Sequence, residues 1–278
     1  MRLARVKFEN RIFWGLVSKD AKSLREIKGK FHDWAPLLTR GEGQESLDLS
    51  SDSTPLFNCH FLPPIEPVNQ VVVAGANYSK HLAEFGVEPV VKPVAFLKSY
   101  GAMIGANDDI QYPPLTEKLD HEVELVAVIG DDKVDSENPY NCVLGYTAGN
   151  DVSARDLQRD GSPKIGMDLF AAKSQDRSTG LGPWIVTKDE FPEGSPSLRL
   201  TLKVNGELRQ DGSSGEMTWG VGELINYVQA ISSFRCGDIL FTGTPSGVAD
   251  ASGKYIQRGD LIEAEVENIG VLRNKVSG

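Results

Sequence analysis

Two carboxylates, Glu122 and Glu124, stand at the start of an apolar run that continues to Ile129 and ends in a Gly-Asp-Asp turn. The run predicts a buried strand. Because side chains alternate along a strand, both carboxylates face one side, with Cα atoms about 6.7 Å apart. Burying them is unfavourable without compensation, which a hard divalent cation such as Mg²⁺ or Mn²⁺ provides through oxygen ligands. Most glutamates face solvent, so a metal site and a solvated pair both remain open.

A second pair, His81 and Glu84, lies on a short helix expected from Asn77 to Glu84, with Asn77 as its N-cap. Residues three apart share one face of a helix. A carboxylate beside a histidine orients the imidazole and raises its basicity, so the pair could act as an acid–base dyad. The alternative is an ion pair on the protein surface.

Three further charged residues stand at or near the ends of predicted elements. Asp151 follows a strand expected over Cys142–Ala148, and Lys98 closes another apolar strand. Lys173 lies within residues 166–183, whose glycines and polar residues predict an irregular loop. Chain segments at the ends of strands often carry site residues, whereas an exposed cation is the ordinary state of a lysine.

The best boundary in the chain is Pro63–Pro67, a stiff proline-rich connector. Residues 1–66 predict a small N-terminal α/β domain. It begins with a hairpin between Arg2 and Val17 and continues with a short helical pattern over Asp20–Ile27. Residues 69–274 form the larger unit.

The C-terminal third predicts elements that lead to a glycine-containing loop. Alternation from Leu198 to Val204 followed by Asn205-Gly206 predicts a hairpin, and helical spacing from Val221 to Ile231 predicts a core helix. A strand then enters the loop Thr242–Gly247, whose backbone N–H groups could bind an anion. The sequence has no Gly-Lys-Ser/Thr there, and no G-x-G-x-x-G, G-x-S-x-G or H-E-x-x-H. A P-loop, a dinucleotide site, a serine hydrolase and a zinc protease therefore have no support.

The composition restricts the class of protein. The chain has 278 residues, 40% of them hydrophobic, and a net charge of −10, which disfavours nucleic acid as a partner. No run of about 18 apolar residues predicts a membrane span, and the first residues lack a signal-peptide core. Three cysteines without paired spacing fit a reducing cytoplasm.

Several short motifs occur together in a fixed order along the chain. They are Asn77-Tyr78-x-x-His81, Glu122-x-Glu124, Asn150-Asp151-x-Ser153-x-Arg155, Lys173-Ser174, and Gly237-Asp238-Ile239 followed by Thr242 to Val248. Each motif is weak alone, but the ordered set resembles the fumarylacetoacetate hydrolase family over roughly residues 69–274.

The resemblance implies an α+β, mostly β fold: a mixed β-sheet roll of the fumarylacetoacetate hydrolase C-terminal type, preceded by a small variable domain. It also implies a homodimer, with one Mg²⁺ or Mn²⁺ per chain. Carried over by motif, Glu122, Glu124 and Asp151 are the metal ligands, and His81 with Glu84 is the general-base dyad. Lys173 faces the substrate as a catalytic residue, and the expected substrate-binding residues are Tyr78, Lys98, Arg155, Gln175, Arg177, Gly243 and Thr244.

The sequence departs from the family pattern on the substrate side. Ser99 and Gly101 replace a frequent proline and serine after Lys98, and Gln175 and Arg177 are unusual after Lys173. The guanidinium of Arg177 could bind a second substrate carboxylate, and an exposed loop arginine is an equal alternative.

The resemblance implies hydrolysis of the C–C bond of an acylpyruvate-like or diketo acid through a metal-stabilised enolate, in catabolism of aromatic compounds or sugar acids. The alternatives with the same site are an oxaloacetate-type decarboxylase, a 2-hydroxyhepta-2,4-diene-1,7-dioate-type isomerase, and a lyase or dehydratase on a 2-oxo acid. A non-catalytic protein of the same fold and a nucleotide-binding module using Gly243–Gly247 are less supported, because the chain retains the full set of candidate catalytic residues.

Overall fold

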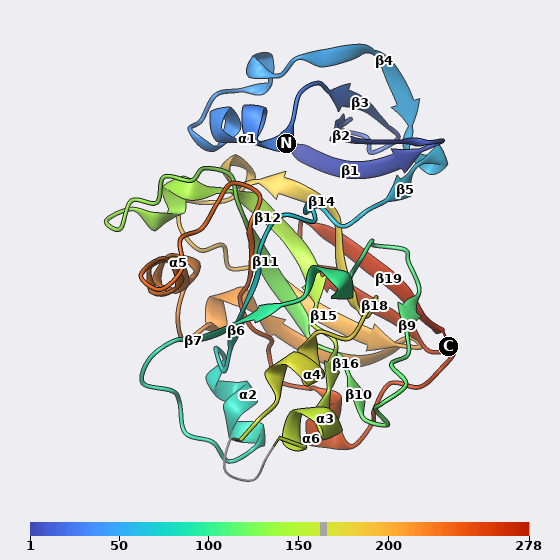
Figure 1. Ribbon diagram of the computed structural model, residues 1–278, viewed down its shortest axis with the longest axis vertical. Coiled ribbons are helices and arrows are strands. Elements are labelled where there is room, and N and C mark those ends of the chain that lie inside the picture. The colour runs from blue at the N-terminus through green and yellow to red at the C-terminus, as the bar shows by residue number, and fades with distance from the viewer. Residues whose placement is uncertain (162–165, 278) are drawn as a thin grey trace.

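Two β-sheets dominate the molecule (Figure 1), which is a computed structural model that describes residues 1–161 and 166–277. The spatial order of the larger sheet is β4 (Leu49–Pro55), β3 (Ser23–Ile27), β2 (Arg11–Val17), β1 (Arg2–Phe8), β14 (Thr179–Thr187), β12 (Val143–Asn150), β11 (Val123–Ile129), β17 (Ile239–Phe241), β6 (Val71–Gly75) and β7 (Val94–Lys98); β5 (His60–Phe61) pairs with β1, and β8 (Met103–Ile104) with β14. Its pairs are mostly antiparallel, with parallel pairs at β17–β6 and β14–β8.

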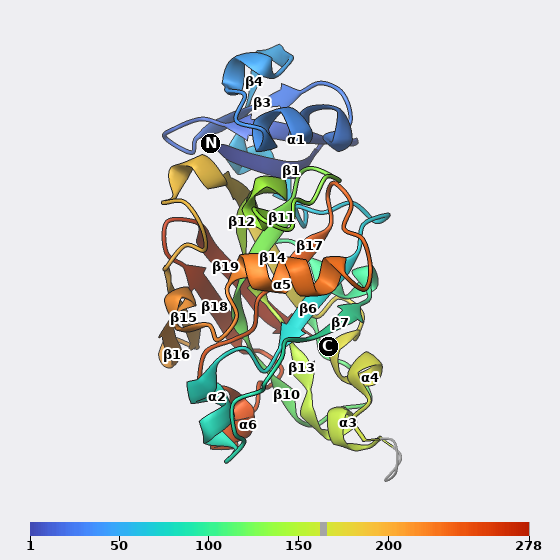
Figure 2. The ribbon, with the colours of Figure 1, turned by 90° about the vertical axis from the view of Figure 1, so that its left-hand side faces the viewer.

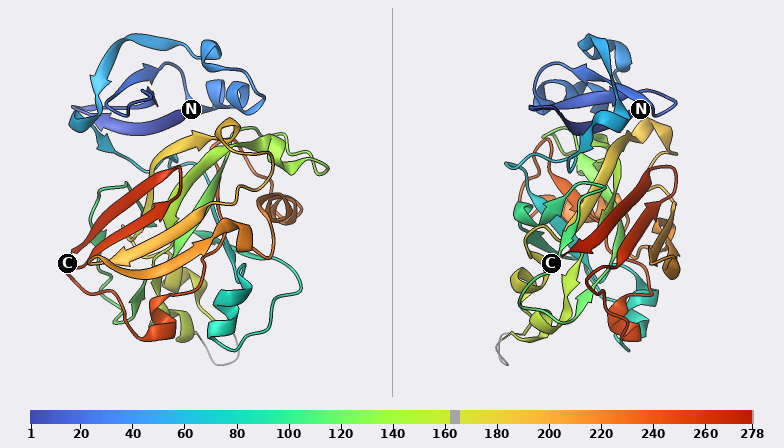
Figure 3. Two further views of the ribbon diagram at one scale, coloured as in Figure 1. Left: turned by 180° about the vertical axis from the view of Figure 1, so that it is seen from behind. Right: turned by 90° about the vertical axis from the view of Figure 1, so that its right-hand side faces the viewer.

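The smaller sheet packs against the middle of the larger one, as the view from behind shows (Figure 3). Its order is β16 (Glu207–Ser213), β15 (Arg199–Val204), β18 (Leu261–Val266), β19 (Gly270–Ser277) and β9 (Ile110–Gln111), and a separate ribbon pairs β10 (Leu119–Asp120) with β13 (Ser153–Ala154). The predicted hairpin at Asn205-Gly206 joins β15 to β16. Both turn residues have positive φ, as a tight hairpin turn requires.

Four short helices gather at the end of the molecule far from the N-terminal strands (Figures 1 and 2). These four are α2 (Ser79–Glu84), α3 (Arg155–Arg159), α4 (Leu169–Lys173) and α6 (Ala249–Ser252). Helices α1 (Phe31–Thr39) and α5 (Val221–Gln229) do not belong to this group. Among the described residues, no helix has the length and apolarity needed to cross a membrane.

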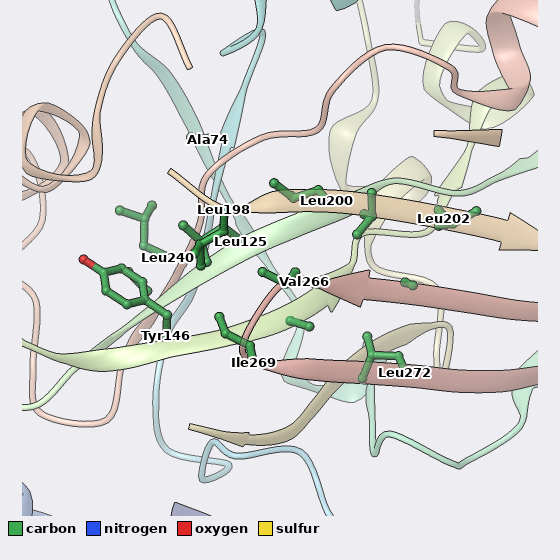
Figure 4. Packing of buried hydrophobic residues seen from close by; sticks show 14 of the residues in the cluster. Ala74, Leu125, Tyr146, Leu198, Leu200, Leu202, Leu240, Val266, Ile269 and Leu272 are labelled. Carbon is green, nitrogen blue, oxygen red and sulfur yellow. The ribbon is translucent and has the colours of Figure 1, made fainter. Parts of the chain in front are cut away.

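The central strand β11 is buried on both faces. Leu125 and Ala127 belong to the core between the two sheets (Figure 4), whereas Val126 and Val128 pack in the core that includes Trp34 of α1. Alternation places Glu124 on the same face as Val126. A strand held on both sides fixes the position of the carboxylate at its start.

The N-terminal strands confirm one prediction and correct another. The hairpin of β1 and β2 forms as expected. The helix expected over Asp20–Ile27 is wrong: Leu24 and Ile27 are buried in β3, which pairs with β2 and β4. β1 also pairs with β14 through Arg2↔Val186, so these strands extend the larger sheet.

Candidate metal centre and active site

Three buried carboxylates converge where β11 begins and β12 ends. Glu122, Glu124 and Asp151 are 4%, 1% and 0% exposed, and their ligand oxygens lie within 4.8 Å of one another. The antiparallel register of β11 and β12 brings them together, and Asp151 N–H donates to the Glu122 carbonyl at 2.8 Å. The alternative of a solvated pair is therefore wrong for Glu122 and Glu124.

Two buried lysines neutralise part of this charge. Nζ of Lys173 lies 2.6 Å from both Glu122 Oε2 and Asp151 Oδ2, and Lys98 contacts Asp151 Oδ1. Burial lowers the pKa of Lys98, although Asp151 opposes this. Burial also opposes the charge of Lys173, but Asp151 and Glu122 raise the pKa of Lys173 above its ordinary value. Lys173 is therefore buried and is not an exposed loop cation. It is the last residue of α4, so the segment predicted as a loop contains a short helix.

Arg155 starts α3 and points its guanidinium at carboxylates. Its Nε donates to Asp120 Oδ2 at 2.8 Å, and its Nη2 contacts Glu122. Burial disfavours ionisation of Glu122, but Lys173 and Arg155 lower the pKa of Glu122 to about 2. Arg155 lines the cavity, as expected of a substrate residue, yet it contacts Glu122, a candidate metal ligand.

Glu124 is the carboxylate that most needs a cation. Among the described residues it receives one hydrogen bond, from Gly243 N–H at 2.7 Å, and no ion pair. Burial, then repulsion from Asp151 and Glu122, raises the pKa of Glu124 well above its ordinary value.

The donor set suits a hard divalent ion. With every group ionised, Asp120, Glu122, Glu124 and Asp151 contribute four negative charges against three positive charges on Lys98, Lys173 and Arg155, which leaves −1. Each carboxylate oxygen has two lone pairs, so oxygens that accept from lysine keep a lone pair for a metal. A divalent ion would change the net charge to +1 and compensate Glu124.

His81 and Glu84 form the predicted pair on α2. His81 Nδ1 lies 3.1 Å from Glu84 Oε2, and the ring packs edge-on against Phe85. Glu84 Oε1 accepts from Gly247 N–H at 2.8 Å. The helix lacks the predicted Asn77 cap, because the Asn77 amide instead donates to backbone carbonyls outside α2.

A cavity of about 430 Å³ contains the metal-ligand candidates and His81 in its walls. Lys173, Arg155, Gly243 and Thr244 also line it, together with apolar side chains. In the loop Thr242–Gly247, the N–H groups of Gly243 and Gly247 donate to Glu124 and Glu84. The loop therefore holds both halves of the site.

Five predicted site residues lie outside the cavity lining, and one of them, Glu84, contacts the lining residue His81. Tyr78 and Lys98 are buried behind the lining; burial raises the pKa of the Tyr78 hydroxyl, which has no hydrogen-bond partner among the described residues. Gln175 donates to Ala171 O within the α4 segment. Arg177 N–H donates to Gly101 O, because the chain turns away after Lys173 toward β14. The structure thus does not bring Gln175 and Arg177 to the cavity, contrary to expectation.

Sequence reasoning missed three polar residues that line the cavity: Gln158, Arg159 and Asp250. The first two share α3 with Arg155. The four-residue spacing of Arg155 and Arg159 was the available signal, because it places both on one face of a helix.

Comparisons with known proteins agree with this geometry. The family model described as "Fumarylacetoacetate (FAA) hydrolase C-terminal" matches residues 70–277. An uncharacterised protein of Pyrococcus abyssi is 41% identical over 209 residues, covering 74% of this chain and 89% of its own. The structure of 5-carboxymethyl-2-hydroxymuconate delta-isomerase from Mycobacterium smegmatis is 34% identical, covers 100% of this chain and 99% of its own, and has a TM-score of 0.80. A fumarylacetoacetate hydrolase from Exiguobacterium antarcticum is 30% identical with the same coverage and a TM-score of 0.79.

Proposed function

Because the chain belongs to the fumarylacetoacetate hydrolase family, we propose that it is a divalent-metal enzyme that hydrolyses the C–C bond of an acylpyruvate-like or diketo acid. The family membership and the mostly-β fold of that type are established by the match over residues 70–277 and by the solved structures. The observation that carries the proposed reaction is the convergence on one cavity of three buried carboxylates and of His81, whose ring contacts Glu84.

In this proposal Glu122, Glu124 and Asp151 hold one Mg²⁺ or Mn²⁺. When bound, the ion supplies positive charge that stabilises the enolate formed when the C–C bond beside a ketone breaks. Lys173 adds an ammonium group beside the same carboxylates, and its contacts with Glu122 and Asp151 fix its position.

His81 is the proposed base. It accepts a proton from a water that attacks the distal carbonyl, while Glu84 orients the ring through Nδ1. Gly247 N–H donates to the other carboxylate oxygen of Glu84, so the loop that supports Glu124 also supports the dyad. The apolar part of the cavity limits access of other water molecules.

Isomerisation is the second candidate, because the Mycobacterium smegmatis structure bears the name of a 5-carboxymethyl-2-hydroxymuconate delta-isomerase. Decarboxylation of an oxaloacetate-like acid and a lyase or dehydratase reaction use the same enolate and stay secondary proposals. We further propose a cytoplasmic homodimer acting in catabolism of aromatic compounds or sugar acids; the three free thiols are compatible with that compartment.

The deciding experiment is a substrate panel of acylpyruvates, oxaloacetate and unsaturated 2-oxo acids, assayed with Mg²⁺ or Mn²⁺ and again with EDTA. Metal-dependent release of pyruvate and a second acid from acylpyruvates supports hydrolysis. Turnover of the unsaturated acid alone identifies an isomerase, and loss of CO₂ from oxaloacetate alone identifies a decarboxylase. Activity that persists in EDTA contradicts the metal assignment.

A further inference from the structure

Arg159 lines the cavity about one helical turn after Arg155. It is the last residue of α3, whereas Arg155 is the first, and both line the cavity. Arg155 contacts Glu122. Four residues of helix separate the two positions by about 6 Å along the axis. Arg159 therefore lies in the same cavity lining as the candidate metal ligands, about one helical turn from the arginine that contacts Glu122.

Asp250 holds the Arg159 guanidinium in a defined orientation. Nη1 donates to Asp250 Oδ1 at 3.0 Å, and Nη2 contacts Oδ2. The Asp250 side chain is 5% exposed and is fixed by the Tyr255 hydroxyl at 2.8 Å, whereas the Arg159 side chain is 55% exposed. A guanidinium has five N–H donors, and two serve Asp250, so three remain for another acceptor.

The other two cations in the lining already have partners. Arg155 and Lys173 are buried against Glu122, Asp120 and Asp151. For Arg159, Asp250 is the only acceptor among the residues that the structure describes. Met167 and Leu169 line the same cavity and offer apolar surface to a methylene chain.

We propose that Arg159, held by Asp250, binds the second carboxylate of the substrate and thereby selects dicarboxylic 2-oxo acids over monocarboxylic ones. This inference rests on the proposed function, because it assumes that the 2-oxo acid end lies at Glu122, Glu124 and Asp151. It gives to Arg159 the role that the sequence had suggested for Arg177, which lies outside the cavity. A planar guanidinium suits a carboxylate better than an ammonium does.

The test is calorimetric binding to the full chain in Mg²⁺ or Mn²⁺ with two ligands that differ only at the far end. 2-Oxoadipate ends in a carboxylate and 2-oxohexanoate in a methyl group, with equal numbers of carbons. We expect wild type to bind 2-oxoadipate about tenfold more tightly, the effect of one charge-assisted contact. Arg159→Gln should abolish this preference and leave the affinity for 2-oxohexanoate unchanged.

Two variants make the result specific. Arg177→Gln removes an arginine outside the cavity and should keep the preference. Arg159→Lys keeps the charge but loses the planar fork, so the preference should fall between wild type and Arg159→Gln. Equal affinity of wild type for both ligands overturns the subsite and leaves the proposed function standing. Loss of the preference in Arg177→Gln also overturns the subsite. If neither ligand binds the metal-loaded protein, the proposed function fails, and the subsite fails with it.

Discussion

The backbone N–H of Gly243 lies 2.7 Å from Oε2 of Glu124 and makes the one hydrogen bond to this carboxylate among the described residues. Four residues later in the same loop, Gly247 N–H supports Glu84, the partner of His81. One short loop thus connects the candidate metal ligand to the candidate base.

Metal should stabilise the protein through Glu124. Mg²⁺ or Mn²⁺ at a hundred times its dissociation constant should raise the free energy of unfolding by about 2.7 kcal/mol over the EDTA-treated protein. Glu124→Gln should lose this increment. Because burial and neighbouring carboxylates raise the pKa of Glu124, removing its charge should not lower the melting temperature without metal. Thermal unfolding with and without EDTA measures both quantities.

Glu265→Gln is the matched control for that experiment, since Glu265 is an exposed glutamate on β18. It should retain the full metal response. A Glu124→Gln protein that is stabilised by metal as strongly as wild type contradicts the assignment of Glu124 as a ligand.

The His81–Glu84 pair should affect catalysis and leave metal binding intact. Loss of a general base lowers kcat by about 10²- to 10⁴-fold. The kcat of His81→Ala for acylpyruvate hydrolysis should therefore be lower than that of wild type by this factor. Glu84→Gln should have a smaller effect because the ring remains. Stopped assays measure kcat, and the metal-dependent rise in melting temperature shows whether metal binding is intact. The two measurements separate an effect on catalysis from an effect on metal binding. Unchanged hydrolysis in His81→Ala contradicts the base assignment, and retained decarboxylation alone favours the secondary reaction.

The ion pair between Arg40 and Asp131 should stabilise the contact of α1 with the end of β11 in a pH-dependent manner. Arg40 Nε lies 2.7 Å from Asp131 Oδ2. Burial disfavours the charge of Asp131, but the hydrogen bond from Arg40 lowers the pKa of Asp131 below its ordinary 3.8. The stabilisation is therefore present above pH 3.8 and lost as the pH falls through the lower pKa of the folded state.

Arg40→Ala should accordingly lower the melting temperature at pH 7 and have progressively less effect as the pH falls below 3.8. Arg235→Ala, an exposed arginine on another loop, should leave the melting temperature unchanged across the same pH range. A pH-independent effect of Arg40→Ala indicates that packing of the arginine stem, rather than the ion pair, matters.

Gly130 permits the close approach of α1 to the end of β11. A Cβ atom there would lie 2.0 Å from Thr39 Oγ1 and 2.7 Å from Leu144 Cβ. Gly130→Ala should therefore cost about 1–3 kcal/mol of stability by overpacking, as measured by urea unfolding. Gly75→Ala is the control, since a Cβ at that glycine meets no atom closer than 3.8 Å. Equal stabilities of the two variants contradict this interpretation.

The sequence predicted elements whose pattern and partners are local. The hairpin at Asn205-Gly206 and the strand after Glu124 have strong short-range signals, and they occur as predicted. The three carboxylates were identified from side-chain chemistry and ordered motifs. Their common burial follows from the register of β11 against β12, which connects residues distant in the sequence.

The errors arose where tertiary contacts override local pattern. β3 contains a charged segment with helical spacing but is held as a strand by neighbours on both sides. α4 is too short to be stable alone, and Asp168 caps it by accepting from Ala171 N–H. The path of the chain after α4 decides that Arg177 leaves the cavity. The position of Asp250, about 90 residues from Arg159, decides how Arg159 is oriented.

The pairing of β1 with β14 also constrains the order of events during synthesis. Arg2 pairs with Val186, so this end of β1 lacks its β14 neighbour until 184 further residues have been synthesised. At about 5–20 residues per second, that delay is on the order of 10 to 40 s. Meanwhile β1 can form its local hairpin with β2, and β5 can pair with Val6 and Lys7, while Arg2 and Leu3 still lack their β14 partners. Nascent chains are therefore exposed to edge-to-edge association in this interval, and the risk ends when β14 is completed.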